Sequence, residues 1–213
     1  MRINNDKTKM LCISACKSYV PQAYFHSSGG SRVSSTNSMK ILGFTFSDQP
    51  NVKLHLKLLQ QKLKCRIWAL RHLRRNGFKQ PDLVVVYTSM IRPLAEYCSS
   101  VYYSMITDSD SLELERLQMQ ALKSIFGWNN SYGSLLQKSG LERLDKRRDD
   151  AFFALAKKLS ESSRFRTWFP KKLARREGIR SSETYKLYPS NTERYLKSPL
   201  NRMRRKLNEL MRT

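Results

Sequence analysis

Residues 53–79 read KLHLKLLQQKLKCRIWALRHLRRNGFK, and this stretch decides the fold of the chain. Its apolar residues recur every three or four positions, which is the spacing of an amphipathic helix. They are Leu56, Leu59, Leu63, Ile67, Leu70 and Leu73. Asn76-Gly77 then supplies a stop signal. The other positions include nine Lys or Arg and no Asp or Glu. From residue 52 onward we therefore expect a helix with one buried leucine face and one wholly cationic exposed face.

The charge of the whole chain follows the same uneven pattern. Its 213 residues hold 40 Lys and Arg against 17 Asp and Glu, a formal net charge of +23. Residues 53–80 hold nine bases and no acids, residues 81–140 hold four bases and six acids, and residues 141–213 hold 21 bases and nine acids. Two basic regions that flank a nearly neutral one are typical of a polyanion-binding protein. Nine cations without an acid favour nucleic acid over the alternative of a merely solvated face.

Composition and length place the chain in a broad class. An apolar content of 40% is adequate for a core, and 213 residues suffice for one ordinary domain or two small ones. No apolar run approaches the roughly 18 residues of a membrane span, and MRINNDKTKM at residues 1–10 lacks the apolar stretch of a signal peptide. We therefore expect an intracellular protein, located in the nucleus or in a cytoplasmic ribonucleoprotein.

The four cysteines are too few and too scattered for a disulfide framework. Cys12 and Cys16 lie close to His26, which raises the possibility of zinc, but no second ligand pair at finger-like spacing follows. Free, mostly buried thiols at Cys12, Cys16, Cys65 and Cys98 are the preferred interpretation.

Short extended segments precede the cationic helix, and further helices follow it. Residues 9–15 and 39–46 each read as one strand, with a bend expected at Gly43, and Gly29-Gly30 indicates a hairpin. Residues 82–105 are apolar almost all round, which predicts a buried helix broken or kinked at Pro93. Helices are also expected after the capping residues at 107–110, at 131–140, at 141–160 and after Ser198-Pro199. The irregular segment 161–197 interleaves aromatic residues with cations, which could stack on bases or anchor the segment onto the preceding helices. The second interpretation is preferred for Phe165, Trp168 and Phe169, because FRTWFP at residues 165–170 reads as an apolar plug.

The expected fold class is therefore mainly α, with a small N-terminal β-rich remnant (α+β) followed by a helical bundle and a basic helical tail. We expect three parts: residues 1–50, residues 51–130 and residues 131–213. The first part has too few strands to be stable alone.

No pattern of a catalytic site stands out. The sequence has no glycine-rich phosphate loop, no metal-ligand cluster and no nucleophile–base pairing. Asp108 and Asp110 stand at a helix start, where capping explains them. Asp149 and Asp150 are adjacent in a helix and point about 100° apart, so they are poorly placed to share metal ions. We predict no catalytic residue, no metal ligand and no cofactor for this chain.

Three stretches together resemble the C-terminal part of reverse transcriptases from non-LTR (LINE-type) retrotransposons. INNDKTKML resembles the Asn-x-x-Lys-Thr element that follows the polymerase active site, here Asn4, Lys7 and Thr8. KILGFTF is similar to the primer-grip strand that ends the palm. The run VVYTSMIRPLAEYCSSVYY and the later LERLQMQALKSIFG are similar to the helical thumb, with its Ile-Arg-Pro…Glu-Tyr-Cys pattern at Ile91, Arg92, Pro93, Glu96, Tyr97 and Cys98. Further on, LERLDKRR, WFP and YLKSPLNRM are similar to the family's tail, so the resemblance spans nearly the whole chain.

The resemblance implies a role for each part. Residues 1–50 would be the end of the palm, residues 51–130 the thumb and residues 131–213 a C-terminal extension. Lys7 would lie near the incoming nucleotide, and Leu42 and Gly43 would belong to the primer grip. The cationic helix would contact a template–primer duplex of RNA or DNA through Lys53, Lys57, Lys62, Lys64, Arg66, Arg71, Arg74 and Arg75.

The sequence departs from the family in one respect. The family's Tyr/Phe-x-Asp-Asp turn, which holds the Mg²⁺ ions of the intact polymerase, does not occur in these 213 residues. We therefore expect a fragment that grips a duplex without copying it, and whose partners include the palm and fingers of the parent polymerase. A free-standing basic RNA- or DNA-binding protein is the alternative. A polybasic membrane-surface protein is disfavoured, because the leucine face is built for packing against protein.

Overall fold

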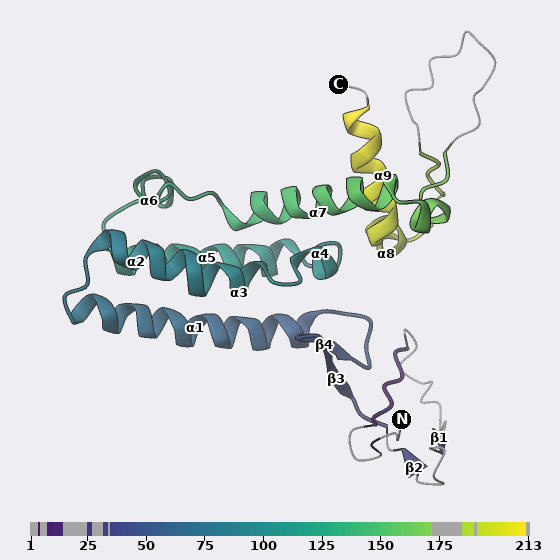
Figure 1. Cartoon of the computed structure of the whole chain (residues 1–213), viewed down its shortest axis with the longest axis horizontal. Coiled ribbons are helices and arrows are strands. Elements are labelled where there is room, and N and C mark those ends of the chain that lie inside the picture. Colours follow the sequence, from purple (N-terminus) through teal and green to yellow (C-terminus); the bar gives the residue numbers. More distant parts are fainter. Residues whose placement is uncertain are drawn as a thin grey trace. The chain divides into compact units, whose positions relative to one another are not determined.

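The computed structural model in Figure 1 describes residues 4, 8–14, 25–26, 32–33, 35–171, 185–189 and 191–211. The chain divides into two compact units, residues 1–61 and residues 62–213. Helices dominate, and the short antiparallel strands lie in the first unit, so the expected fold class is confirmed. The expected division at residues 50 and 130 stays a prediction.

The first unit contains two small hairpins. β1 (Phe25–His26) pairs antiparallel with β2 (Arg32–Val33), and the Gly29-Gly30 turn expected between them lies outside the described residues. β3 (Ser38–Ile41) pairs antiparallel with β4 (Phe44–Ser47), with Ile41 opposite Phe44. Residues 39–46 were expected as one strand with a bend at Gly43. The bend is there, but one continuous strand was wrong, because the chain reverses fully at Leu42-Gly43 and forms two strands. Residues 9–15 were also expected as a strand, but there the described residues show only one bridge, between Met10 and Ser35.

α1 (Lys53–Arg75) is the helix expected from the leucine spacing. Five of its six predicted leucine-face residues are buried, and Leu73 is half-buried. Gly77 follows the helix with φ +87°, a conformation that favours glycine, as the stop signal predicted.

An interrupted helical segment follows α1. It consists of α2 (Gln80–Val86), a π-helical turn (Tyr87–Ile91), α3 (Arg92–Glu96) and α4 (Ser99–Tyr102). Pro93 has no N–H to give to the carbonyl four residues earlier, and just before it the Arg92 N–H bonds to the Tyr87 carbonyl, five residues back. The break at Pro93 is thus confirmed. The prediction that residues 82–105 form a buried helix was wrong in part, since Val85, Met90 and Tyr97 are exposed.

α5 (Asp108–Phe126), α6 (Tyr132–Ser139) and α7 (Leu144–Glu161) build the middle of the second unit. The Thr107 side chain accepts from the Asp110 N–H, and the Asp110 carboxylate accepts from the Thr107 N–H, which makes a capping box. Leu114, Leu117, Ala121 and Ile125 are buried on one face of α5, as expected. α7 packs against α5, and α9 (Pro199–Leu210) packs against α7 (Figure 1).

A smaller apolar core joins α7 to the C-terminal elements. It is formed by Phe152, Ala156, Phe169, Tyr185, Met203 and Leu207. A 3₁₀ helix (Ser163–Trp168) leads into it, and α8 (Glu193–Leu196) precedes α9. Of the expected plug FRTWFP, Phe169 is buried whereas Trp168 is exposed. None of the helices in the described ranges is long and apolar enough to cross a lipid bilayer.

Candidate nucleic-acid interface

Four cations of α1 share one face, which we call the cationic stripe: Lys57, Lys64, Arg71 and Arg75. Successive heptad positions advance about 10 Å along a helix and rotate by only about 20°. Lys57 and Arg75 are five full turns apart, so they lie about 27 Å from each other on the same side of the helix. The stripe lies on the flank of the helix beside the buried leucine face, about 100° around the helix axis from its centre.

The four other predicted α1 cations are all exposed to solvent. Lys53, Lys62, Arg66 and Arg74 are exposed, as are Lys57, Lys64 and Arg75 of the stripe, while Arg71 is half-buried. Arg74 follows Ile67 by seven residues and Leu70 by four, so it emerges on the leucine side of the helix rather than on the stripe.

The charge of α1 is not neutralised by the described part of the protein. Elsewhere in the described chain, cations within 4.0 Å of a carboxylate include Arg92, Arg116, Arg143, Lys146, Arg147, Lys197 and Lys206. No described carboxylate lies within that distance of a Lys or Arg of α1. A polyanion could therefore bind this helix without first displacing an acidic partner.

Two of the eight predicted contact residues also have a structural role. The Arg66 guanidinium donates to the Met90 carbonyl, and the Arg71 Nε donates to the Ser124 Oγ at 3.1 Å. Both bonds join the second half of α1 to other helices of its unit. The remaining cations are therefore better reporters of ligand binding than these two.

Sequence reasoning missed two exposed tryptophans beside these cations. Trp68 follows Lys64 by four residues and stacks on the His72 ring, with centroids 5.4 Å apart. Trp128 follows α5, and the Arg71 guanidinium carbon lies 5.7 Å from its ring centroid. The helical spacing from Lys64 could have revealed Trp68, whereas only the tertiary fold brings Trp128 to α1.

The predicted primer-grip residues form the tip of the β3–β4 hairpin. Leu42 and Gly43 have φ +47° and +85°, as in the two-residue turns that usually contain Asn-Gly. Leu42 is 86% exposed, so its apolar side chain is accessible to a ligand. The hairpin is fixed to the start of α1, because the Thr45 N–H donates to His55 Nδ1 at 3.3 Å and Phe44 stacks on the His55 ring. Lys7, the predicted nucleotide-proximal residue, lies outside the described residues.

The backbone of Leu42 provides a testable prediction. A left-handed conformation costs an L-residue about 1–2 kcal/mol, and Asn tolerates it better than Leu. We expect Leu42→Asn to stabilise the hairpin by about 0.5–1 kcal/mol and Gly43→Ala to destabilise it by a similar amount. Hydrogen exchange of the β3 and β4 amides measures both effects. Faster exchange in Leu42→Asn would contradict the strained turn.

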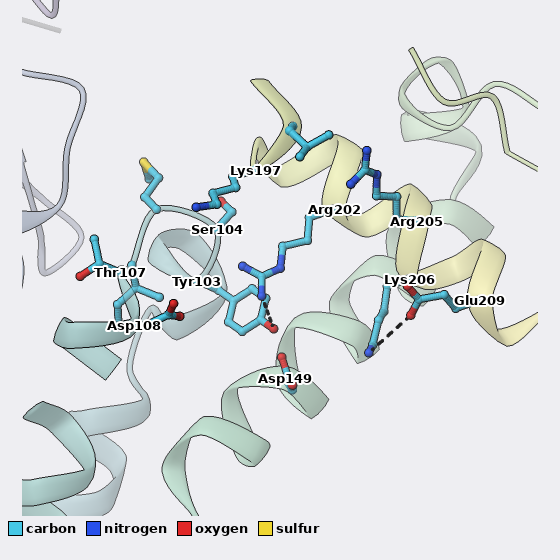
Figure 2. Close-up of a pocket in the computed structure, with 13 residues that line it drawn as sticks. Tyr103, Ser104, Thr107, Asp108, Asp149, Lys197, Arg202, Arg205, Lys206 and Glu209 are labelled. Atoms are coloured by element: carbon cyan, nitrogen blue, oxygen red, sulfur yellow. Dashed lines mark hydrogen bonds and ion pairs between the residues drawn. The ribbon is translucent and has the colours of Figure 1, made fainter. Parts of the chain in front are cut away.

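A second candidate site is a cleft of about 580 Å³ within the second unit (Figure 2). Its lining includes four cations, Lys197, Arg202, Arg205 and Lys206, and three carboxylates, Asp108, Asp149 and Glu209. The Arg202 guanidinium carbon lies 4.1 Å from the Tyr103 ring centroid, and its Nη2 donates to the Tyr103 hydroxyl at 3.0 Å. Because the charges nearly balance, this cleft has little electrostatic preference for a polyanion. The α1 face is the stronger candidate.

The described residues contain no candidate metal-binding site. Groups of three or more His, Cys, Asp or Glu placed to hold an ion are absent from them. Asp149 and Asp150 are both exposed on α7, and Asp149 lines the cleft. Cys12, Cys65 and Cys98 are free thiols, but the expectation that they are mostly buried was wrong, since Cys65 is exposed and the other two are half-buried. Cys16 and the side chain of His26, which were considered as zinc ligands, lie outside the described positions.

In comparisons with known proteins, no protein-family model, no curated protein and no solved structure matches this chain.

Proposed function

We propose that this chain binds nucleic acid through the exposed cationic face of α1, and that it grips a template–primer duplex of RNA or DNA as the thumb part of a non-LTR reverse transcriptase. The observation that carries the binding proposal is the set of α1 cations without a carboxylate partner among the described residues. The polymerase assignment rests on the sequence resemblance alone. On this proposal the chain acts inside the cell, beside the Mg²⁺-binding palm and the fingers of the parent enzyme.

The dimensions of the cationic stripe suit the backbone of a duplex. Its length of about 27 Å corresponds to roughly eight base-pair steps of 3.4 Å. Lysines one heptad apart could each meet a different phosphate of a duplex laid along the helix. Such contacts position a duplex without reading its sequence. We therefore propose binding that depends strongly on salt and weakly on base sequence.

The burial of the leucine face argues against a membrane surface as the partner. A helix that lies on a bilayer inserts its apolar face into the lipid. In α1 that face is already covered by protein, since Leu56, Leu63 and Leu70 are each less than 3% exposed. A duplex needs only the cations, which remain exposed.

The salt dependence of duplex binding tests the proposal. We expect the triple variant Lys57→Gln, Lys64→Gln, Arg75→Gln to flatten the slope of log affinity against log salt by about two to three units, because each lost phosphate contact removes about 0.9. Arg71 is left intact, since its bond to Ser124 also serves the fold. The helix should persist, because Gln is nearly as good a helix former as Lys or Arg. Fluorescence anisotropy with a blunt duplex between 50 and 200 mM salt measures the slope.

A matched control removes three charges elsewhere. Arg116 and Lys146 each pair with a nearby glutamate, and Lys138 donates to Asn130. The triple variant Arg116→Gln, Lys138→Gln, Lys146→Gln has the same net charge as the stripe variant, and its slope should stay near the parental value. If the parental protein and a folded stripe variant have equal slopes of log affinity against log salt, the proposed contacts between the stripe and the duplex phosphates are rejected. Tighter binding to anionic vesicles than to the duplex would point to a membrane partner.

A further inference from the structure

Trp68 interrupts the cationic stripe with a large exposed ring. It lies between Lys64 and Arg71 on the same side of α1, and it is 65% exposed. The His72 ring stacks against it at an interplanar angle of 18°. This contact leaves much of the indole accessible and limits its motion.

A second indole lies close to the same position. Trp128 is 59% exposed, and the cationic groups of Arg71 and Lys123 lie 5.7 and 5.9 Å from its ring centroid. Arg71 is also the i+3 neighbour of Trp68, and such neighbours have Cβ atoms about 5–6 Å apart. The Arg71 bond to Ser124 fixes the cation that lies beside Trp128 and about one helical turn along α1 from Trp68.

We call these six residues of the second unit the tryptophan surface: Lys64, Trp68, Arg71, His72, Lys123 and Trp128. It offers flat π-faces beside positive charges, and none of the described carboxylates pairs with its cations. Bases within a duplex are stacked on each other and cannot use such faces. Unpaired bases can, and aromatic stacking contributes about 1–3 kcal/mol per base regardless of base identity.

We propose that the tryptophan surface binds unpaired nucleotides, with bases stacked on Trp68 and Trp128 and phosphates near Lys64 and Lys123. This inference rests on the proposed nucleic-acid binding and specifies its ligand: a duplex that continues into a single strand. The cationic stripe holds the duplex phosphates, and the indoles hold the strand where pairing ends.

The test compares three ligands that share one duplex. The first is blunt, the second carries a six-nucleotide single-stranded extension, and the third carries an extension of six abasic residues with the same phosphates. We expect the full chain to bind the base-bearing extension about tenfold or more tighter than the abasic one at 150 mM salt, a ratio that corresponds to about 1.4 kcal/mol or more. In the double variant Trp68→Ala, Trp128→Ala that ratio should fall to near one, while the salt slope on the blunt duplex is unchanged.

Trp168→Ala is the matched control, because Trp168 is exposed beside Phe165 on a different element. It should leave the ratio as in the parental protein. Equal affinity of the parental protein for base-bearing and abasic extensions would reject stacking while leaving the duplex grip intact, and this comparison needs no folded variant. Absence of salt-dependent binding to all three ligands would reject both proposals. Loss of blunt-duplex affinity in a folded tryptophan variant would show a contact to the duplex instead of to unpaired bases.

Discussion

Substituting leucine for Glu115 is expected to lower the free energy of unfolding by about 3–5 kcal/mol. Glu115 is only 5% exposed, and its carboxylate accepts hydrogen bonds from the Tyr132 hydroxyl and from the Asp145 N–H. It thereby joins α5 to the first turns of α6 and α7. Leucine would leave two donors without an acceptor, at a cost of about 1–3 kcal/mol each. Burial, together with the hydrogen bond to Glu115, raises the pKa of Tyr132 above its usual range, so this hydroxyl remains a donor in alkaline solution.

Glu115→Gln separates the acceptor role from the size of the side chain. Gln keeps one carbonyl oxygen, so we expect it to cost about 1 kcal/mol, well below the cost of Leu. Urea unfolding followed by circular dichroism measures both variants, and hydrogen exchange at the Asp145 amide reports the lost bond directly. A Leu variant within 1 kcal/mol of the parental protein would show that the Glu115 bonds contribute little.

The sequence predicts the helices well where local signals agree. In α1 the leucine period, the lack of acids and Gly77 all point to one amphipathic helix that stops near residue 75, and the structure confirms it. The same holds for α5, where Thr107 and Asp110 form the expected cap. Hydrophobic period and capping are properties of a single segment, so they can be seen without knowledge of its neighbours.

The misses arise where a residue's environment comes from other segments. Glu115 reads as one of several acids near the start of a helix, and only the approach of α6 and α7 buries it. At Gly43 the sequence predicted a bend but not the full reversal between β3 and β4. Leu42 is a poor turn residue, so KILGFTF has the pattern of one bent strand. Val85 and Met90 are apolar yet exposed, and nothing in their segment shows which side the core will cover.

The candidate site likewise has one part that the sequence predicts and one part that only the tertiary structure shows. The α1 cations could be found from the sequence because the helix itself orders them into the cationic stripe. The position of Trp128 near Arg71 depends on the packing of α1 beside the end of α5, which joins residues 57 positions apart in the chain. The cationic face of a helix can thus be predicted from the sequence of that helix alone. A site that combines cations with aromatic rings from two segments can be found only from the tertiary structure.

Raising the pH from about 10 to about 12 is expected to lower the free energy of unfolding by about 4 kcal/mol through Tyr87 and Tyr102, two of the tyrosines whose pKa is raised by burial. Burial raises the pKa of Tyr102 from 10.0 to about 12, and burial, followed by the Glu96 carboxylate, raises that of Tyr87 further. Both phenols stay protonated in the folded protein while they ionise in the unfolded chain. Their stabilising contribution is therefore complete below pH 10 and is lost as the pH rises toward the folded-state values. Each tyrosine contributes a slope of up to about 1.4 kcal/mol per pH unit, which is greatest between the unfolded-state and folded-state pKa values.

Phenylalanine substitutions assign that slope to individual residues. Tyr87 donates to Gln118 Oε1 at 2.7 Å and Tyr102 donates to the Ala95 carbonyl at 3.0 Å, so either Phe variant should lose about 1–2 kcal/mol at pH 8. Above pH 10 the same variant has one fewer group to ionise on unfolding, and its stability should fall less steeply by about 1.4 kcal/mol per pH unit. The curves of variant and parental protein should therefore converge or cross between pH 10 and 12. Parallel curves for the parental protein and both Phe variants would mean that other groups control alkaline unfolding. Removing a buried phenol that must ionise on unfolding has to change the slope.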